Sequence, residues 1–121
     1  PLREFLYVND FAEACFDVLE KWEPNKYNSP YDSQGNLLNW LNVGSKFEIS
    51  IKNLAQKISK IIGYSGYIKW DKTMPDGTPR KKLDTTYLNK LGWESKTDLE
   101  IGIKKTFECF KNELKEKTIR F

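Results

Sequence analysis

The segment from Ser50 to Gly63 constrains the fold more than any other part of the sequence. Its apolar residues recur at the spacing of one helical face. They are Ile51, Leu54, Ala55, Ile58, Ile61 and Ile62. Ser50 can accept a hydrogen bond from the first turn, and Gly63 can take the left-handed conformation that commonly ends a helix. An amphipathic helix between these two residues is the firmest prediction.

A second helix is predicted over about residues 10–22. Asp10 stands at its start as a capping residue, and Glu13 follows at the spacing of a capping-box partner. One helical face carries Ala12, Cys15, Phe16, Leu19 and Trp22. This apolar face is expected to point toward a core.

Two more helices are predicted in the second half of the chain. One spans about residues 98–116 and begins with Thr97 and Glu100 in capping-box spacing. Its apolar face carries Leu99, Ile103, Phe107, Phe110 and Leu114. The other is short, is capped by Asp84 or by the Thr that follows it, and ends at Gly92.

Three short strands are predicted over residues 3–8, 41–43 and 66–70, from their β-branched and aromatic content. Residues 23–36 are rich in Pro, Asn, Asp and Ser, and they are expected to form a long surface loop. About four helices with few short strands indicate a mixed α/β fold in one unit. The strands are too few for a large self-sufficient sheet.

The composition excludes several kinds of site. The chain has no His, which removes the commonest general base and the commonest metal ligand. Cys15 and Cys109 stand alone, so no zinc site is predicted and buried free thiols are expected. No Gly-rich phosphate loop and no G-x-S-x-G turn is present. We therefore predict no catalytic, metal-binding or cofactor-binding residue in this chain.

Charge and hydropathy limit the partners and the location. The net charge of +3 is mild, whereas a dedicated nucleic-acid binder usually concentrates more positive charge. No apolar run approaches the length that crosses a bilayer, and no signal-peptide pattern is visible. The sequence thus favours a cytoplasmic protein that binds neither nucleic acid nor membrane. It does not begin with Met, and we expect it to come from a longer protein.

The stretch MPDGTPRKKLD, residues 74–84, allows two interpretations. It can be a turn followed by a solvated basic edge, which is the usual state of a charge run. It can also hold an anion, because its prolines stiffen the backbone and its cations offer charge-assisted hydrogen bonds. In an extended segment, Arg80 and Lys82 point to one face and Lys81 to the other. The three cations therefore cannot all serve one site without a bend.

Four segments, in this order, carry a resemblance to a known family. They are PLREFLYVNDFAEAC, LNVGSKFEISIKNLAQKISKIIGYSGYIKWD, MPDGTPRKKLD and LGWESKTDLEIGIKKTFECF. The chain resembles the C-terminal part of the GDP-L-fucose synthases, which belong to the extended short-chain dehydrogenase/reductase superfamily. The R-E-F-x-x-V-x-D pattern indicates the wider group of nucleotide-sugar epimerases and dehydratases. P-D-G-T-P-R-K-x-L-D followed by L-G-W is more specific to this family.

The resemblance implies an activity and partners. Enzymes of this family epimerise GDP-4-keto-6-deoxy-D-mannose at C3 and C5, then reduce its C4 ketone with NADPH to give GDP-L-fucose. Their cofactor loop and catalytic residues lie upstream of the matched segments. This chain is therefore expected to bind the GDP-sugar without holding NADPH or the catalytic centre. The full-length enzyme is expected to be a homodimer.

The resemblance also implies individual roles. Arg3 and Lys81 match the family's Arg and Lys that contact the GDP portion of the substrate. Arg80 matches the same motif and is a further substrate-binding candidate. Residues 1–44 are expected to pack on a missing Rossmann-type domain, and residues 45–121 to form the substrate domain proper.

The residues alone are compatible with two other functions. The chain can be part of another NAD(P)-dependent nucleotide-sugar epimerase or dehydratase. It can also be a small basic module that binds RNA or an acidic protein, in which case its affinity would fall steeply with salt. The second of these is less favoured, because aromatic residues lie on the predicted apolar helix faces and not beside the basic stretch.

Overall fold

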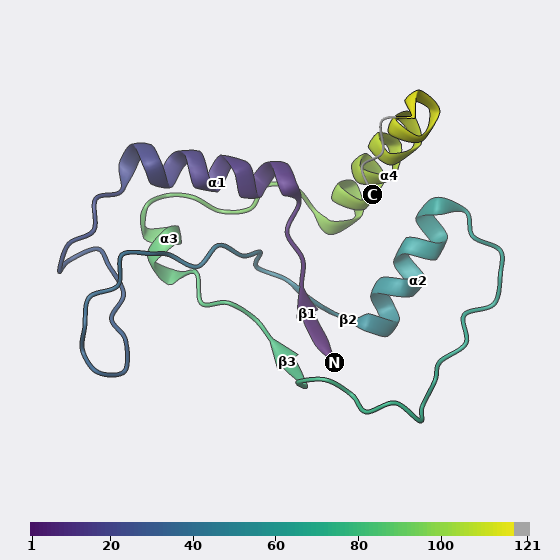
Figure 1. Ribbon diagram of the computed structural model, residues 1–121, viewed down its shortest axis with the longest axis horizontal. Helices are drawn as coiled ribbons and strands as arrows, with labels where there is room; N and C mark the ends of the chain where they lie inside the picture. Colours follow the sequence, from purple (N-terminus) through teal and green to yellow (C-terminus); the bar gives the residue numbers. More distant parts are fainter. Residues whose placement is uncertain (118–121) are drawn as a thin grey trace.

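The computed structural model describes residues 1–117, in which four helices flank a small sheet. The strands are β1 (Leu2–Glu4), β2 (Glu48–Ser50) and β3 (Arg80–Lys81), and the helices are α1 (Val8–Lys21), α2 (Ile51–Ile62), α3 (Thr86–Lys90) and α4 (Leu99–Glu116). Figure 1 shows α1 beside α3 and α2 beside α4, with the sheet between the two pairs. The predicted mixed α/β class is confirmed. Within the described residues, no helix is both long and apolar enough to cross a membrane.

The sheet has the strand order β2-β1-β3. The central strand β1 runs antiparallel to β2 and parallel to β3. β1 overlaps the start of the strand predicted over residues 3–8, but the sequence pattern predicts neither β2 nor β3. The predictions of strands over residues 41–43 and 66–70 are wrong, because both segments are irregular. A strand needs a neighbouring backbone, which a β-rich composition alone does not supply.

The buried core lies between α1 and α3. Its fully buried apolar residues are Ala14, Leu88 and Trp93. Partly buried side chains pack around them, namely Leu6, Val18, Leu41, Val43 and Leu91. Leu41 and Val43 therefore belong to the core although their segment forms no strand. Their apolar pattern reflected burial, not strand pairing.

Helix α1 has apolar side chains on more than one face. The prediction that its main apolar face points to the core is wrong for this chain, since Phe16 is 59% exposed and Leu19 is 85% exposed. The core contact of α1 comes from Ala14, which is fully buried, and from Val18, which is partly buried. The Cys15 and Cys109 thiols are free and exposed, which corrects the expectation of buried thiols. Within the described residues, α1 leaves a wide apolar surface uncovered.

Helix α2 is confirmed at both ends. The Ser50 hydroxyl accepts a hydrogen bond from the Asn53 N–H at 3.1 Å, and Gly63 adopts a left-handed φ of 71°. α2 packs against α4, and Leu54 and Ile58 are half-buried there. No α2 residue is fully buried. The helix therefore contributes an amphipathic layer and not a closed core.

The two acids that the sequence assigns to the cap of α1 have a different role. α1 begins at Val8, so Asp10 lies inside the helix, where it is 5% exposed. Its carboxylate accepts hydrogen bonds from the Lys96 N–H at 2.9 Å, the Thr97 N–H at 2.8 Å and the Thr97 hydroxyl at 2.7 Å. Glu13 pairs with the Lys96 ammonium. Both acids thus tie α1 to the segment that precedes α4.

The other capping predictions have mixed outcomes. The Asp98 carboxylate caps α4 by accepting from the Glu100 N–H at 2.8 Å, so the predicted cap at Thr97 is wrong. The Thr97 hydroxyl is used in the contact with α1 instead. At the start of α3, Thr85 occupies the N-cap position without a side-chain cap bond, and the Asp84 carboxylate accepts from the Thr86 N–H at 2.9 Å, so Asp84 is the one of the two predicted residues whose side chain binds the helix start.

Candidate anion-binding site

The sheet brings Arg3 and Lys81 side by side. The two residues are Cα partners in the parallel pairing of β1 with β3, so their side chains leave the same face of the sheet. The Leu2 N–H donates to the Pro79 carbonyl at 2.8 Å, which joins the end of the turn to β1. Two candidate residues from opposite parts of the sequence therefore become neighbours.

The Arg3 guanidinium is held by backbone carbonyls. Its Nη1 donates to the Leu2 oxygen at 2.7 Å and to the Thr78 oxygen at 2.8 Å. A Cβ added at Gly77 would lie 3.3 Å from Nη2, so the glycine leaves room for the guanidinium. Arg3 is half-buried, and its other N–H groups have no acceptor within residues 1–117. They are available to an anion.

Lys81 differs from its two neighbours in the basic stretch. It is exposed, and its ammonium forms no hydrogen bond or ion pair within the described part of the chain. Arg80 and Lys82 both have partners there. The free charge of the stretch is therefore on the face that carries Arg3.

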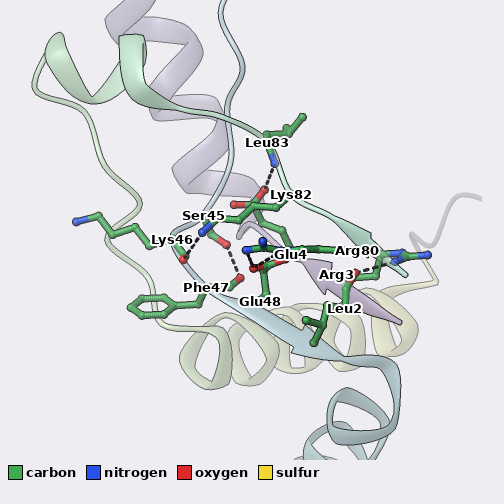
Figure 2. Close-up of polar contacts among 10 residues, drawn as sticks. All are labelled: Leu2, Arg3, Glu4, Ser45, Lys46, Phe47, Glu48, Arg80, Lys82 and Leu83. Atoms are coloured by element: carbon green, nitrogen blue, oxygen red, sulfur yellow. Dashed lines mark hydrogen bonds and ion pairs between the residues drawn. The ribbon is translucent and has the colours of Figure 1, made fainter. Parts of the chain in front are cut away.

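Arg80 leaves the opposite face and pairs with Glu48 of β2. Its Nε donates to the two carboxylate oxygens at 2.8 and 3.0 Å, and its Nη2 donates to Oε2 at 2.5 Å. The hydrogen bonds with Glu48 raise the pKa of Arg80, and those with Arg80 lower the pKa of Glu48. Figure 2 shows Arg80 reaching toward Glu48 while the Arg3 guanidinium points away from this pair.

Two further contacts fasten the chain after Lys81 (Figure 2). The Lys82 ammonium donates to the Lys46 carbonyl at 3.2 Å, and the Leu83 N–H donates to the Glu4 carboxylate at 3.2 Å. This carboxylate lies against Gly44, where an added Cβ would come within 2.7 Å of Oε2. The segment is therefore joined to β1 through Glu4 and to the residues before β2 through Lys46.

Sequence reasoning identified the cations but missed two carboxylates. Glu4 and Glu48 are directly paired across β1 and β2, where like charges repel. Arg80 offsets that repulsion on their face. The sequence around a single Glu in a short strand does not indicate which cation it pairs with. Only the strand register could have revealed the pairing of Glu48 with Arg80. The other face, with Arg3 and Lys81, can bind an anion such as a phosphate or diphosphate.

The described residues contain no group of three or more His, Cys, Asp or Glu side chains that could hold a metal ion. No protein-family model matches the sequence. The chain is 40% identical over 110 residues to the GDP-L-fucose synthase of Escherichia coli K12. The aligned residues cover 91% of this chain and 33% of that protein. The chain spans about a third of the length of the curated relatives it matches.

Solved structures of GDP-sugar reductases are also similar to this chain. A GDP-6-OMe-4-keto-L-xylo-heptose reductase from Campylobacter jejuni superposes with a TM-score of 0.78 at 27% identity, over 93% of this chain and 31% of that one. A GDP-mannoheptose C4 reductase from the same organism, with NADP bound, shares the fold with a TM-score of 0.70 at 24% identity, over 91% of this chain and 32% of that one. By sequence and structure together, the chain is a homologue of the GDP-L-fucose synthases and has the fold of part of an extended short-chain dehydrogenase/reductase.

Proposed function

We propose that this chain is the substrate-binding part of an NADPH-dependent enzyme that converts GDP-4-keto-6-deoxymannose to GDP-L-fucose. The observation that carries the proposal is the pairing of Arg3 with Lys81 across β1 and β3. The guanidinium offers a planar fork of donors, and the ammonium offers a mobile point charge. Together they suit the diphosphate of a GDP-sugar. Arg80 remains a candidate for the same substrate, although it is directed at Glu48 in this chain.

In this proposal the chain binds and orients the nucleotide sugar. Fixing the diphosphate at two charged groups restricts where the attached sugar ring can lie. The residues present do not fit a dinucleotide site, because residues 1–117 contain no Gly-rich turn that joins a strand to a helix. We therefore place NADPH and the catalytic residues in the remainder of the enzyme.

The domain organisation forms part of the proposal. Residues 1–44 would pack on the cofactor-binding domain, and residues 45–121 would form the substrate domain. The exposed apolar face of α1 supports this arrangement, because large apolar surfaces mark interfaces. A homodimer, which the family resemblance implies, and a cytoplasmic location, which the lack of a signal-peptide pattern favours, belong to the same proposal.

A second candidate is a reductase that acts on a different GDP-sugar. The similarity to the heptose reductase favours it, since that structure covers 93% of this chain. Both functions use the GDP portion in the same way and differ in the sugar. Incubation of the full-length enzyme with NADPH and a panel of 4-keto GDP-sugars distinguishes them by the product formed. UDP-, CDP- and dTDP-sugars serve as controls for the base.

Substitution of the two cations tests the binding assignment. Lys81→Ala and Arg3→Ala in the full-length enzyme should each weaken GDP-sugar binding by about 1–3 kcal/mol, the scale of a lost hydrogen bond to a charged group. NADPH affinity should not change. Lys52→Ala removes an exposed lysine of α2 and is the matched control. Titration calorimetry measures these affinities, and unchanged GDP binding in both variants would refute the assignment.

A further inference from the structure

The strand that carries Lys81 has little backbone pairing of its own. β3 contains two residues, and the preceding residues 63–79 form neither helix nor strand. Ordering such a connection costs conformational entropy, and a two-residue strand recovers few hydrogen bonds in return. Side-chain contacts must therefore contribute to the register of β3 on β1.

The bidentate contact of Arg80 with Glu48 is the strongest of these contacts, because both partners carry charge. The Glu48 side chain is 13% exposed, whereas that of Arg80 is 63% exposed. An ion pair that solvent reaches this easily adds little to overall stability. Its distinctive property is geometric, since it ties β3 to the far strand of the sheet across β1.

We propose that Glu48 and Arg80 are positioning residues whose ion pair fixes the register of β3 and so places Lys81 beside Arg3. The inference rests on the proposed function, because it takes Lys81 as a ligand of the substrate diphosphate. A slip of one residue would turn Lys81 to the Glu48 face and bring a neighbouring cation to the Arg3 face. The ion pair thus selects which of three consecutive cations meets the substrate.

Direct contact of Arg80 with the diphosphate is the competing role, and it predicts the opposite result for Glu48→Gln. If the ion pair positions Lys81, this isosteric change in the full-length enzyme should weaken GDP binding about tenfold, by loosening a charge-assisted contact. If Arg80 binds the diphosphate itself, release from Glu48 should leave GDP affinity unchanged or increase it. Glu100→Gln is the matched control, because it breaks the ion pairs of Glu100 with Lys57 of α2 and Lys104 of α4, which lie outside the sheet.

Exchange of the two charges provides the second test. The double variant Glu48→Arg/Arg80→Glu should restore GDP affinity to within about threefold of the original, because it rebuilds the pair with its ends reversed. A directly binding Arg80 could not be replaced by a carboxylate, so affinity would then stay low. NADPH affinity and the unfolding temperature verify that each variant is folded. If the exchanged protein does not fold, Glu48→Gln decides the question alone.

Lys81→Ala separates failure of this inference from failure of the proposed function. Unchanged GDP affinity in Lys81→Ala would overturn both. Weaker binding in Lys81→Ala combined with normal binding in Glu48→Gln would overturn only the positioning role. Weaker binding in both, with recovery in the exchanged protein, supports it.

Discussion

Helices α1 and α2 have similarly clear apolar faces in the sequence, yet those faces meet different surroundings. The face of α2 is half-buried against α4 at Leu54 and Ile58. The corresponding face of α1 leaves Leu19 85% exposed, and a different side of the helix supplies Ala14 to the core and Asp10 to the segment before α4. A period of 3.6 residues identifies an apolar face, but it does not reveal whether the same chain covers that face.

The difference indicates distinct structural roles. α2 stabilises one layer with its single apolar face. α1 contributes to the core on one side and presents apolar side chains on the other, as expected for a helix between two layers. Substitutions on each side of α1 can therefore be compared with substitutions in α2 and α4.

The largest effect is expected in the core that α1 shares with α3. Leu88→Ala should lower the free energy of unfolding by about 2–5 kcal/mol, because truncation of a buried Leu loses contacts and leaves a cavity. Leu114→Ala, at a position of α4 that is 57% exposed, should change it by less than about 0.5 kcal/mol. Urea unfolding followed by Trp fluorescence measures both. Equal effects would contradict the location of the core.

An intermediate, pH-dependent effect is expected at Asp10. Burial pushes its pKa upward, but hydrogen bonds from Thr97 and the Lys96 N–H outweigh burial, and the pKa lies below the usual 3.8. The pKa of Asp10 is lower in the folded state than in the unfolded state. The charged carboxylate therefore stabilises the fold at pH values above the unfolded-state pKa. That contribution is lost as the pH falls through the folded value.

Asp10→Asn should therefore lower the free energy of unfolding by about 1–3 kcal/mol near neutral pH. The gap from the original chain should narrow as the pH is lowered below the usual pKa of 3.8. Urea unfolding at a series of pH values measures it. Asp17→Asn removes an acid that pairs with Lys21 on the same helix and serves as the control. A gap that stays constant with pH would show that the Asp10 charge is not what holds the segment.

The smallest effect on the isolated chain is expected on the exposed face of α1. Leu19→Lys should change its free energy of unfolding by less than about 0.5 kcal/mol, because the side chain is already in solvent. Ile58→Lys in α2 should destabilise the same chain, since that position is half-buried. In the full-length enzyme, Leu19→Lys should become clearly destabilising if another domain covers α1. Equal unfolding midpoints for the original and the variant full-length enzyme would contradict the proposed interface.

The parts of the fold that the sequence predicts well are those with local causes. The ends of α2 follow from Ser50 and Gly63, which act within one turn. β2 and β3 could not be predicted in this way, because their partner β1 lies far away in sequence. Asp10 is of a residue type that commonly caps helices, but hydrogen bonds from a segment 86 positions away determine its role.

The candidate site shows the same division. The alternation of side chains predicts that Arg80 and Lys81 diverge, and the strand register agrees. The identity of the partner on each face depends on tertiary pairing. Glu48 and Arg3 could be assigned to opposite faces only once the positions of β1 and β2 were known.

The hydrogen bond from Arg3 to the Thr78 carbonyl joins residues 75 positions apart. Contacts at such separation require closure of a long loop, and chains that depend on them fold more slowly than chains with local contacts. The hydrogen bonds of the helices are local and do not need this closure, whereas the pairing of Arg3 with Lys81 does. A ligand that binds only the closed state would then favour completion of folding by mass action. Recognition of the proposed substrate and closure of this long loop would thus depend on the same atoms.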